Sequence, residues 1–179
     1  DLDISTINEL PPGRSPVTTR LVNNTRRKEI FERVREACLA GNQAYWVCPL
    51  IEESTIDNSE TLQLQTLLET HQQLTLAFPD LRVSLIHGKQ ESGIKTATMA
   101  AFKVGEIQLL VATTVIEVGV DVPNASTMVI EHAERMGLAQ LHQLRGRVGR
   151  GAAQSVCILL FQQPLSELAR ARLKIIYEN

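Results

Sequence analysis

The sequence predicts an α/β domain of three layers, in which helices cover both faces of a mostly parallel central sheet. Short apolar runs alternate with longer segments of helical period along the chain, which is the pattern of such a domain. Several runs are continuous Val, Ile and Leu, as expected for strands buried on both faces. The 179 residues, 44% of them apolar, suffice for one well-filled core.

The expected strands and helices alternate along the whole chain. Strands are expected at residues 17–22, 44–47, 82–86, 107–112, 127–130 and 155–161. Helices are expected at residues 26–40, 60–77, 91–103, 137–150 and 164–179. Each crossover has a dozen or more residues, so the chain can return for a parallel strand.

The two ends lie outside this pattern. Residues 1–16 hold three prolines and are expected to form an extended lead-in, followed by one domain over residues 17–163. The chain begins at Asp1 without Met and stops inside a helical pattern with no C-cap. We therefore interpret it as a piece of a longer protein.

The net charge of −2 does not by itself indicate a nucleic-acid or membrane partner. The charge is unevenly distributed, however: residues 135–179 carry seven bases against two acids, or +5, which leaves −7 on residues 1–134. With only seven Phe, Tyr and Trp residues in total, a base-stacking platform for single strands is disfavoured.

The three cysteines are widely separated and form no C-x-x-C pair, so neither a disulfide framework nor a zinc ribbon is expected. No metal-ligand cluster is predicted elsewhere. No apolar run approaches the roughly 20 residues of a membrane span, and no secretion signal opens the chain. We expect a protein of the reducing cytoplasm.

The first segment with a chemical pattern follows the strand expected at residues 107–112. Thr113 and Thr114 emerge at its carboxyl end, where ligands bind to open α/β sheets. Thr114 and Glu117 have the spacing of a capping box, which either presents amide groups to a phosphate or only caps a helix. Gly119 and Asp121 follow, and the carboxylate could reach a ribose hydroxyl or hold the turn.

The second segment is the helix expected at residues 137–150. Leu138, Leu141, Leu144 and Val148 form an apolar stripe, and a second stripe on another face consists of Gln140, Gln143, Arg147 and Arg150. The alternative is a solvated basic face, but no acid lies between Arg135 and Arg150. Guanidinium groups suit phosphoryl transfer because they bind phosphate bidentately. Gly146 and Gly149 disfavour a helix, so we expect a ligand or another backbone to approach them closely.

These two segments resemble superfamily 2 helicases. Residues 112–121 resemble helicase motif V, and residues 143–150, with their Q-x-x-G-R-x-x-R spacing, resemble motif VI. His87 and Gly88, followed by a helix that ends at Phe102, are similar to a segment of the same second motor domain. The resemblance covers essentially the whole chain and implies a RecA-like fold, the C-terminal helicase domain of P-loop NTPases.

The resemblance also implies roles for single residues. Arg150 would be the arginine finger on the γ-phosphate, and Arg147 its partner at the phosphates. Gln143, Gly119 and Asp121 would contact ATP. Thr113, Thr114, His87 and Gly88 would lie along the nucleic-acid backbone, although His87 could simply end a strand.

Two parts of such a motor are absent from the sequence. No G-x-x-x-x-G-K-[ST] motif occurs, so ATP and Mg would be bound mainly by a first motor domain in the parent chain. Residues 164–179 would begin a helical hairpin used in translocation. The isolated chain is therefore expected to be inactive.

Within superfamily 2, the chain most resembles bacterial ATP-dependent DNA helicases that remodel branched DNA, such as stalled forks and Holliday junctions. In the parent, the expected partners are branched duplex DNA, the first motor domain and a wedge domain. Two alternatives remain at this point: the motor of a transcription-repair coupling factor, and a non-catalytic nucleic-acid-binding module.

Overall fold

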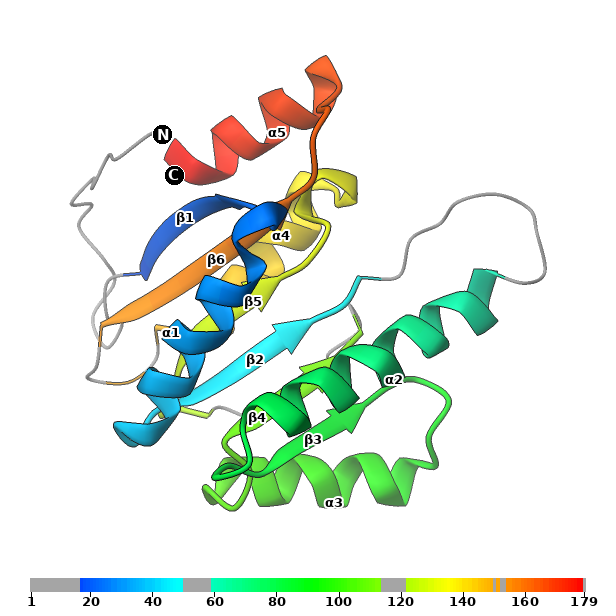
Figure 1. Cartoon of the computed structure of the whole chain (residues 1–179), viewed down its shortest axis with the longest axis vertical. Helices are drawn as coiled ribbons and strands as arrows, with labels where there is room; N and C mark the ends of the chain where they lie inside the picture. Colours follow the sequence, from blue (N-terminus) through cyan, green and yellow to red (C-terminus); the bar gives the residue numbers. More distant parts are fainter. Residues whose placement is uncertain (1–16, 50–58, 114–121, 150, 152–153, 179) are drawn as a thin grey trace.

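A computed structural model describes residues 17–49, 59–113, 122–149, 151 and 154–178, with residues 59–63 described by their backbone only. Its centre is a six-stranded, all-parallel sheet in the order β1-β6-β5-β2-β4-β3 (Figure 1). The strands are β1 (Val17–Asn23), β2 (Gln43–Val47), β3 (Val83–Ile86), β4 (Leu109–Ala112), β5 (Ala125–Ile130) and β6 (Ser155–Phe161). The α/β prediction is confirmed, and the strand bounds agree with expectation to within two residues.

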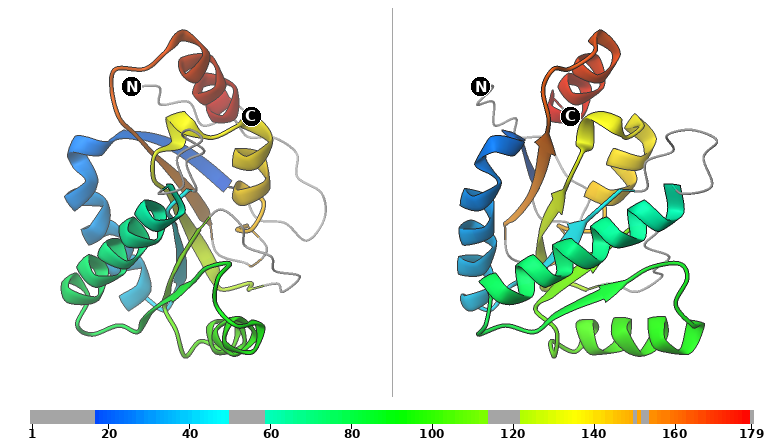
Figure 2. Two further views of the ribbon diagram at one scale, coloured as in Figure 1. Left: turned by 90° about the vertical axis from the view of Figure 1, so that its right-hand side faces the viewer. Right: turned by 45° about the vertical axis from the view of Figure 1, so that its right-hand side comes forward.

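Helices cover both faces of this sheet. They are α1 (Arg27–Leu39), α2 (Ser59–Ala77), α3 (Ser92–Lys103), α4 (Leu138–Arg145) and α5 (Glu167–Glu178), with short 3₁₀ turns η1 (Asn24–Arg26) and η2 (Ala133–Arg135). The left view of Figure 2 shows α1 and α2 on one side of the sheet and α3 and α4 on the other. The result is the three-layer arrangement that the sequence predicts.

Two apolar clusters, one on each face, stabilise the layers. Trp46 of β2 packs with residues of α1 and α2, whereas its neighbours Tyr45 and Val47 pack with residues of α3, α4 and α5. Successive side chains of a strand point to opposite faces, so a continuous apolar run supplies both clusters. All residues of β2, β4 and β5 are buried, which explains why their sequences do not alternate.

The prediction of a helix from residue 137 to residue 150 is wrong at its end. Helix α4 stops at Arg145, and Gly146 is its C-cap. Gly149 has a φ of 87°, which is costly for any residue except glycine. Gly149 therefore serves the change of chain direction after α4, whereas Gly146 has ordinary helical angles, with φ −67°. Arg147 lies in a turn and not on the helical face proposed for it.

All six strands end at the same edge of the sheet, because they are parallel. At this carboxyl edge the main chain ties neighbouring strand ends together. The Cys48 N–H donates to the Ala112 carbonyl at 2.7 Å, and the Glu131 N–H donates to the Val47 carbonyl at 3.0 Å. The ends of β4, β2 and β5 are thereby fixed relative to one another, and they form a rigid base for the residues that follow them.

Candidate functional site

The carboxyl edge brings together three described residues that the sequence singled out, namely His87, Gly88 and Thr113, whereas Gln143 lies on α4 and Arg147 in the turn after it. Thr113 directly follows β4, and His87 directly follows β3. Ile86 is paired with Ala112 in the β3–β4 register, so His87 and Thr113 continue from neighbouring positions. Thr114, Gly119, Asp121 and Arg150 lie outside the described residues.

His87 begins a tightly hydrogen-bonded turn between β3 and α3. The Gln90 side chain accepts from the His87 N–H at 3.2 Å and donates to the Leu85 carbonyl at 3.4 Å, and the Gln90 N–H donates to the His87 carbonyl at 3.2 Å. The His87 Nδ1 accepts from the Lys89 N–H at 3.2 Å. In the neutral ring the proton is then on Nε2, which is able to donate to an anion.

The electrostatic surroundings of His87 favour this neutral form. Partial burial lowers the pKa of His87 below its usual value, and the nearby Lys95 and Lys89 ammonium groups lower it further. Gly88 beside it is exposed, and a Cβ there would meet no atom within 4 Å. The turn therefore combines a shaped backbone, a neutral donor and positive charge, which suits a phosphate oxygen.

Helix α4 holds the described part of the motif VI segment. Leu141 and Leu144, together with Val148 in the following turn, are buried as predicted. The Gln140 side chain accepts from the Gly137 N–H at 3.4 Å and so caps the start of the helix. Gln143 is exposed and Arg147 is half-buried. The helix is thus anchored by its leucines while an amide and a guanidinium remain at least partly accessible.

Arg145 has a separate, structural role that the sequence did not reveal. Its Nη1 donates to the Ile176 carbonyl of α5 at 2.8 Å and to the Thr19 hydroxyl of β1 at 3.2 Å. Burial lowers the pKa of Arg145 and is also the main reason that the pKa of the adjacent His142 is lowered. Arg145 therefore connects α4 to α5 and β1, in contrast to Arg147, which lies in the turn beyond it.

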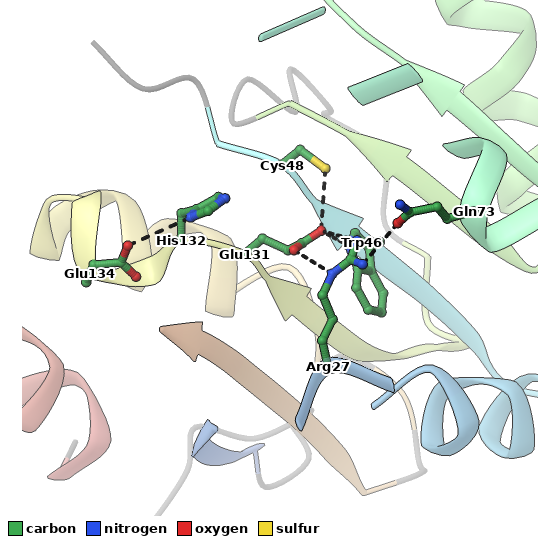
Figure 3. A network of polar contacts seen from close by, with 7 residues as sticks. All are labelled: Arg27, Trp46, Cys48, Gln73, Glu131, His132 and Glu134. Carbon is green, nitrogen blue, oxygen red and sulfur yellow. Dashed lines mark hydrogen bonds and ion pairs between the residues drawn. The ribbon is translucent and has the colours of Figure 1, made fainter. Parts of the chain in front are cut away.

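A buried polar network at the carboxyl edge of the sheet was also not predicted from the sequence (Figure 3). Glu131, the first residue after β5, accepts hydrogen bonds from Arg27 of α1 and from the Trp46 indole of β2. Burial and the negative charge of Glu131 raise the pKa of the Cys48 thiol to about 12, so this cysteine is unreactive at neutral pH. A lone acid directly after a continuous apolar strand is the only sequence signal for the network.

Two polar side chains of α4 and the turn after it fit a nucleotide phosphate. A guanidinium such as that of Arg147 can bind phosphate oxygens bidentately, and the Gln143 amide can also donate. Among the described residues, no group of three or more His, Cys, Asp or Glu side chains could hold a metal ion. In the same part of the chain, no helix is long and apolar enough to cross a membrane.

Comparison with known proteins agrees with this arrangement. Residues 29–152 match the family described as "Helicase conserved C-terminal domain". The chain therefore belongs to this family of helicase domains, and its fold is RecA-like. Members of the family use ATP.

Several curated proteins similar to this chain are named ATP-dependent DNA helicase RecG. It is 58% identical over 180 residues to RecG of Escherichia coli (strain K12), covering 100% of this chain and 25% of the relative. It is 47% identical over 174 residues to RecG of Aquifex aeolicus, covering 97% of this chain and 21% of the relative. The chain thus spans about a quarter of the length of these relatives.

Solved structures give the same result. A structure of RecG bound to a three-way DNA junction matches 96% of this chain and 21% of its own, with a TM-score of 0.78 and 41% identity. Yeast Dbp5 bound to RNA and ADP BeF3 matches 92% of this chain with a TM-score of 0.58, but at 15% identity it supports the fold alone.

Proposed function

We propose that this chain is the second motor domain of an ATP-dependent DNA helicase that remodels branched DNA, such as stalled forks and Holliday junctions. The observation that carries the proposal is the similarity to RecG over the whole chain, joined to a solved relative bound to a three-way DNA junction. Similarity to RecG over the whole chain favours a branched-DNA helicase over a transcription-repair coupling factor.

In this proposal the nucleotide lies between this domain and a first motor domain of the parent chain, which binds most of ATP and Mg. Bound ATP supplies the γ-phosphoryl group whose transfer to water drives movement. Arg150 would reach the γ-phosphate from across the interface and stabilise the charge that develops in the transition state. Arg147 and Gln143 would contact the phosphates, and Gly119 and Asp121 the nucleoside.

The DNA backbone is proposed to run over the ends of β3 and β4. His87 and Gly88 follow one strand, and Thr113 and Thr114 follow the next. These residues would supply side-chain and backbone donors to phosphate oxygens, with Thr113 contributing only at its 6% exposed surface. Such contacts position a motor on DNA without reading its sequence. Closure of the two motor domains on ATP and their opening after hydrolysis would then move the domain along the duplex. In the parent chain a wedge domain would lie beside the two motor domains, and the protein would act in the bacterial cytoplasm.

The proposal is tested by a graft. We would replace the matching quarter of E. coli RecG with this chain and measure ATP hydrolysis stimulated by a three-way DNA junction. The grafted helicase should hydrolyse ATP and rearrange the junction. A well-folded graft that binds the junction but neither hydrolyses ATP nor remodels DNA would contradict the proposal.

Within this graft, Arg150→Ala should lower the turnover number by about a thousandfold or more, because an arginine finger acts in the transition state. DNA affinity should be nearly unchanged, since the residue is proposed to face ATP. Lys103→Ala, which removes a base from the last turn of α3, is the matched control and should leave turnover intact. Turnover that survives Arg150→Ala would refute the arginine-finger assignment.

A further inference from the structure

Glu131 is a buried carboxylate at the carboxyl edge to which the proposed function gives no role. Its side chain is 9% exposed. Oε1 accepts from Arg27 Nε at 2.8 Å, while Oε2 accepts from Arg27 Nη2 at 3.1 Å and from the Trp46 indole at 2.7 Å (Figure 3). A two-pronged carboxylate–guanidinium pair of this kind fixes both distance and orientation.

Arg27 joins the carboxylate to both helices on its face of the sheet. It begins α1, and its Nη1 donates to the Gln73 side chain of α2 at 3.0 Å. Its guanidinium also lies 4.9 Å from the Phe31 ring centre and 5.8 Å from the Trp46 ring centre. The arginine is therefore held from several sides, and it keeps Glu131 at one position relative to α1, α2 and β2.

The residue after Glu131 has a strained backbone. His132 has φ 50° and ψ 42°, the left-handed region that a residue with a side chain adopts only when its surroundings require it. From there the chain passes to the opposite face of the sheet, where Ala133 and Met136 join the core packed against α3, α4 and α5. The sharp turn at His132 thus leads directly to η2 and α4.

A second carboxylate fastens the far side of this turn. Glu134 Oε1 accepts from the Gln162 N–H at 3.1 Å, and its backbone carbonyl accepts from Arg172 at 3.0 Å. The Glu134 carboxylate also lies 3.8 Å from His132 Nδ1 (Figure 3). The connection from β5 to α4 is therefore anchored by the residue before its left-handed residue and by the second residue after it.

We propose that Glu131, held by Arg27, is a positioning residue for α4 and for Arg147 in the turn that follows it. This inference rests on the proposed function, in which Gln143 and Arg147 face a bound nucleotide. The carboxylate holds the strained turn at His132, so the start of α4 keeps a fixed offset from the strand ends. Phosphoryl transfer depends on the geometry of the phosphate-binding groups, so a small displacement of α4 would slow it.

The test is Glu131→Gln in the grafted helicase. The amide keeps the shape and can still accept from Trp46, but it loses the charge that holds the Arg27 guanidinium. We expect a fall in the turnover number of about tenfold or more, with junction affinity nearly unchanged. Arg27→Lys, which keeps the charge and loses the two-pronged contact, should give an intermediate fall.

Asp80→Asn is the matched control. It breaks the 2.8 Å ion pair between Arg35 and Asp80, which also involves α1 but lies toward the other end of that helix. Its turnover number should equal that of the unsubstituted graft. If Glu131→Gln and Asp80→Asn lower thermal stability and turnover in parallel, Glu131 is merely structural and the inference is overturned.

A second readout does not depend on activity. Hydrogen exchange of the amides of residues 133–147 should be faster in Glu131→Gln than in Asp80→Asn when each is made in the 179-residue chain alone. Equal exchange would overturn the inference even if the graft is active. Faster exchange in an inactive graft would support the positioning role while the proposed function itself failed.

Discussion

Single residues in the loops that flank the sheet have roles that depend on backbone contact as much as on side-chain chemistry. Gly151 is the example nearest to the proposed arginine finger. A Cβ built on it lies 3.0 Å from the carbonyl carbon of Pro123 and overlaps the attached oxygen. The segment after motif V and the residue after motif VI can therefore meet only because position 151 has no side chain.

Gly151→Ala should lower the free energy of unfolding by about 1–3 kcal/mol, the usual cost of overpacking. The obstacle is backbone and cannot rotate away. Gly93→Ala is the matched control, because nothing lies within 4 Å of a Cβ at this position in α3. It should be neutral or slightly stabilising. Urea unfolding measures both, and equal stability of the two variants would contradict the close approach.

The lowered pKa values of two histidines predict that the stability of the fold depends on pH. The pKa values of His87 and His142 are lowered, mainly by partial burial and further by nearby lysines and Arg145. The unfolded chain therefore binds protons more readily than the folded one. The contribution of these histidines to the free energy of unfolding should be complete above pH 6.5, the ordinary histidine pKa, and should be lost as the pH decreases through the lowered pKa values.

The measurement is urea unfolding at pH 7.5 and at pH 5.5. The chain should be less stable at the lower pH, and the difference should shrink when both histidines are replaced by Gln. An unchanged difference in the double variant would assign the effect to other groups.

At the scale of elements, α4 shows how a short helix can be held firmly in place. Its eight residues are too few for a helix that is stable by itself, so packing must hold it. Leu141 and Leu144 supply that packing, and Arg145 adds hydrogen bonds to α5 and β1. The polar side of α4 can then face a ligand without loss of the helix.

Leu141→Ala should lower the free energy of unfolding by about 2–5 kcal/mol, because the fully buried side chain would leave a cavity. Leu168→Ala on α5 is the control, since Leu168 is 68% exposed, and it should change stability by less than about 0.5 kcal/mol. Thermal or urea unfolding compares the two. Similar losses in both variants would mean that α4 does not pack as described.

At the scale of the whole molecule, the chain is a helicase C-terminal domain whose proposed nucleotide site needs a second domain. We therefore expect the 179-residue chain alone to hydrolyse no ATP, with or without junction DNA. A phosphate-release assay on a preparation free of other ATPases measures this. DNA-stimulated hydrolysis that disappears in Arg150→Ala would show that the chain forms a complete site by itself.

Most of the fold could be predicted from the sequence. Continuous apolar runs marked β2, β4 and β5 because both faces of these strands are buried, and helical period marked the five helices. The end of α4 was predicted wrongly, since the apolar stripe continues through Val148 although the helix stops at Arg145. The turn differs from a further helical turn in the hydrogen bonds from the Arg147 and Val148 N–H groups to carbonyls three residues earlier, and in the positive φ of Gly149.

The sequence by itself determined the α/β class, the alternation of elements and the resemblance of motifs V and VI, because each depends on neighbouring residues or fixed spacing. The tertiary structure decided which distant positions meet: His87 beside Thr113, Gly151 against Pro123, and Arg27 bonded to Glu131 across 104 positions. It also distinguished the structural role of Arg145, which bonds to α5 and β1, from the position of Arg147 in the turn after α4. Contacts between distant positions depend on strand order and register, and these follow from packing of the whole chain.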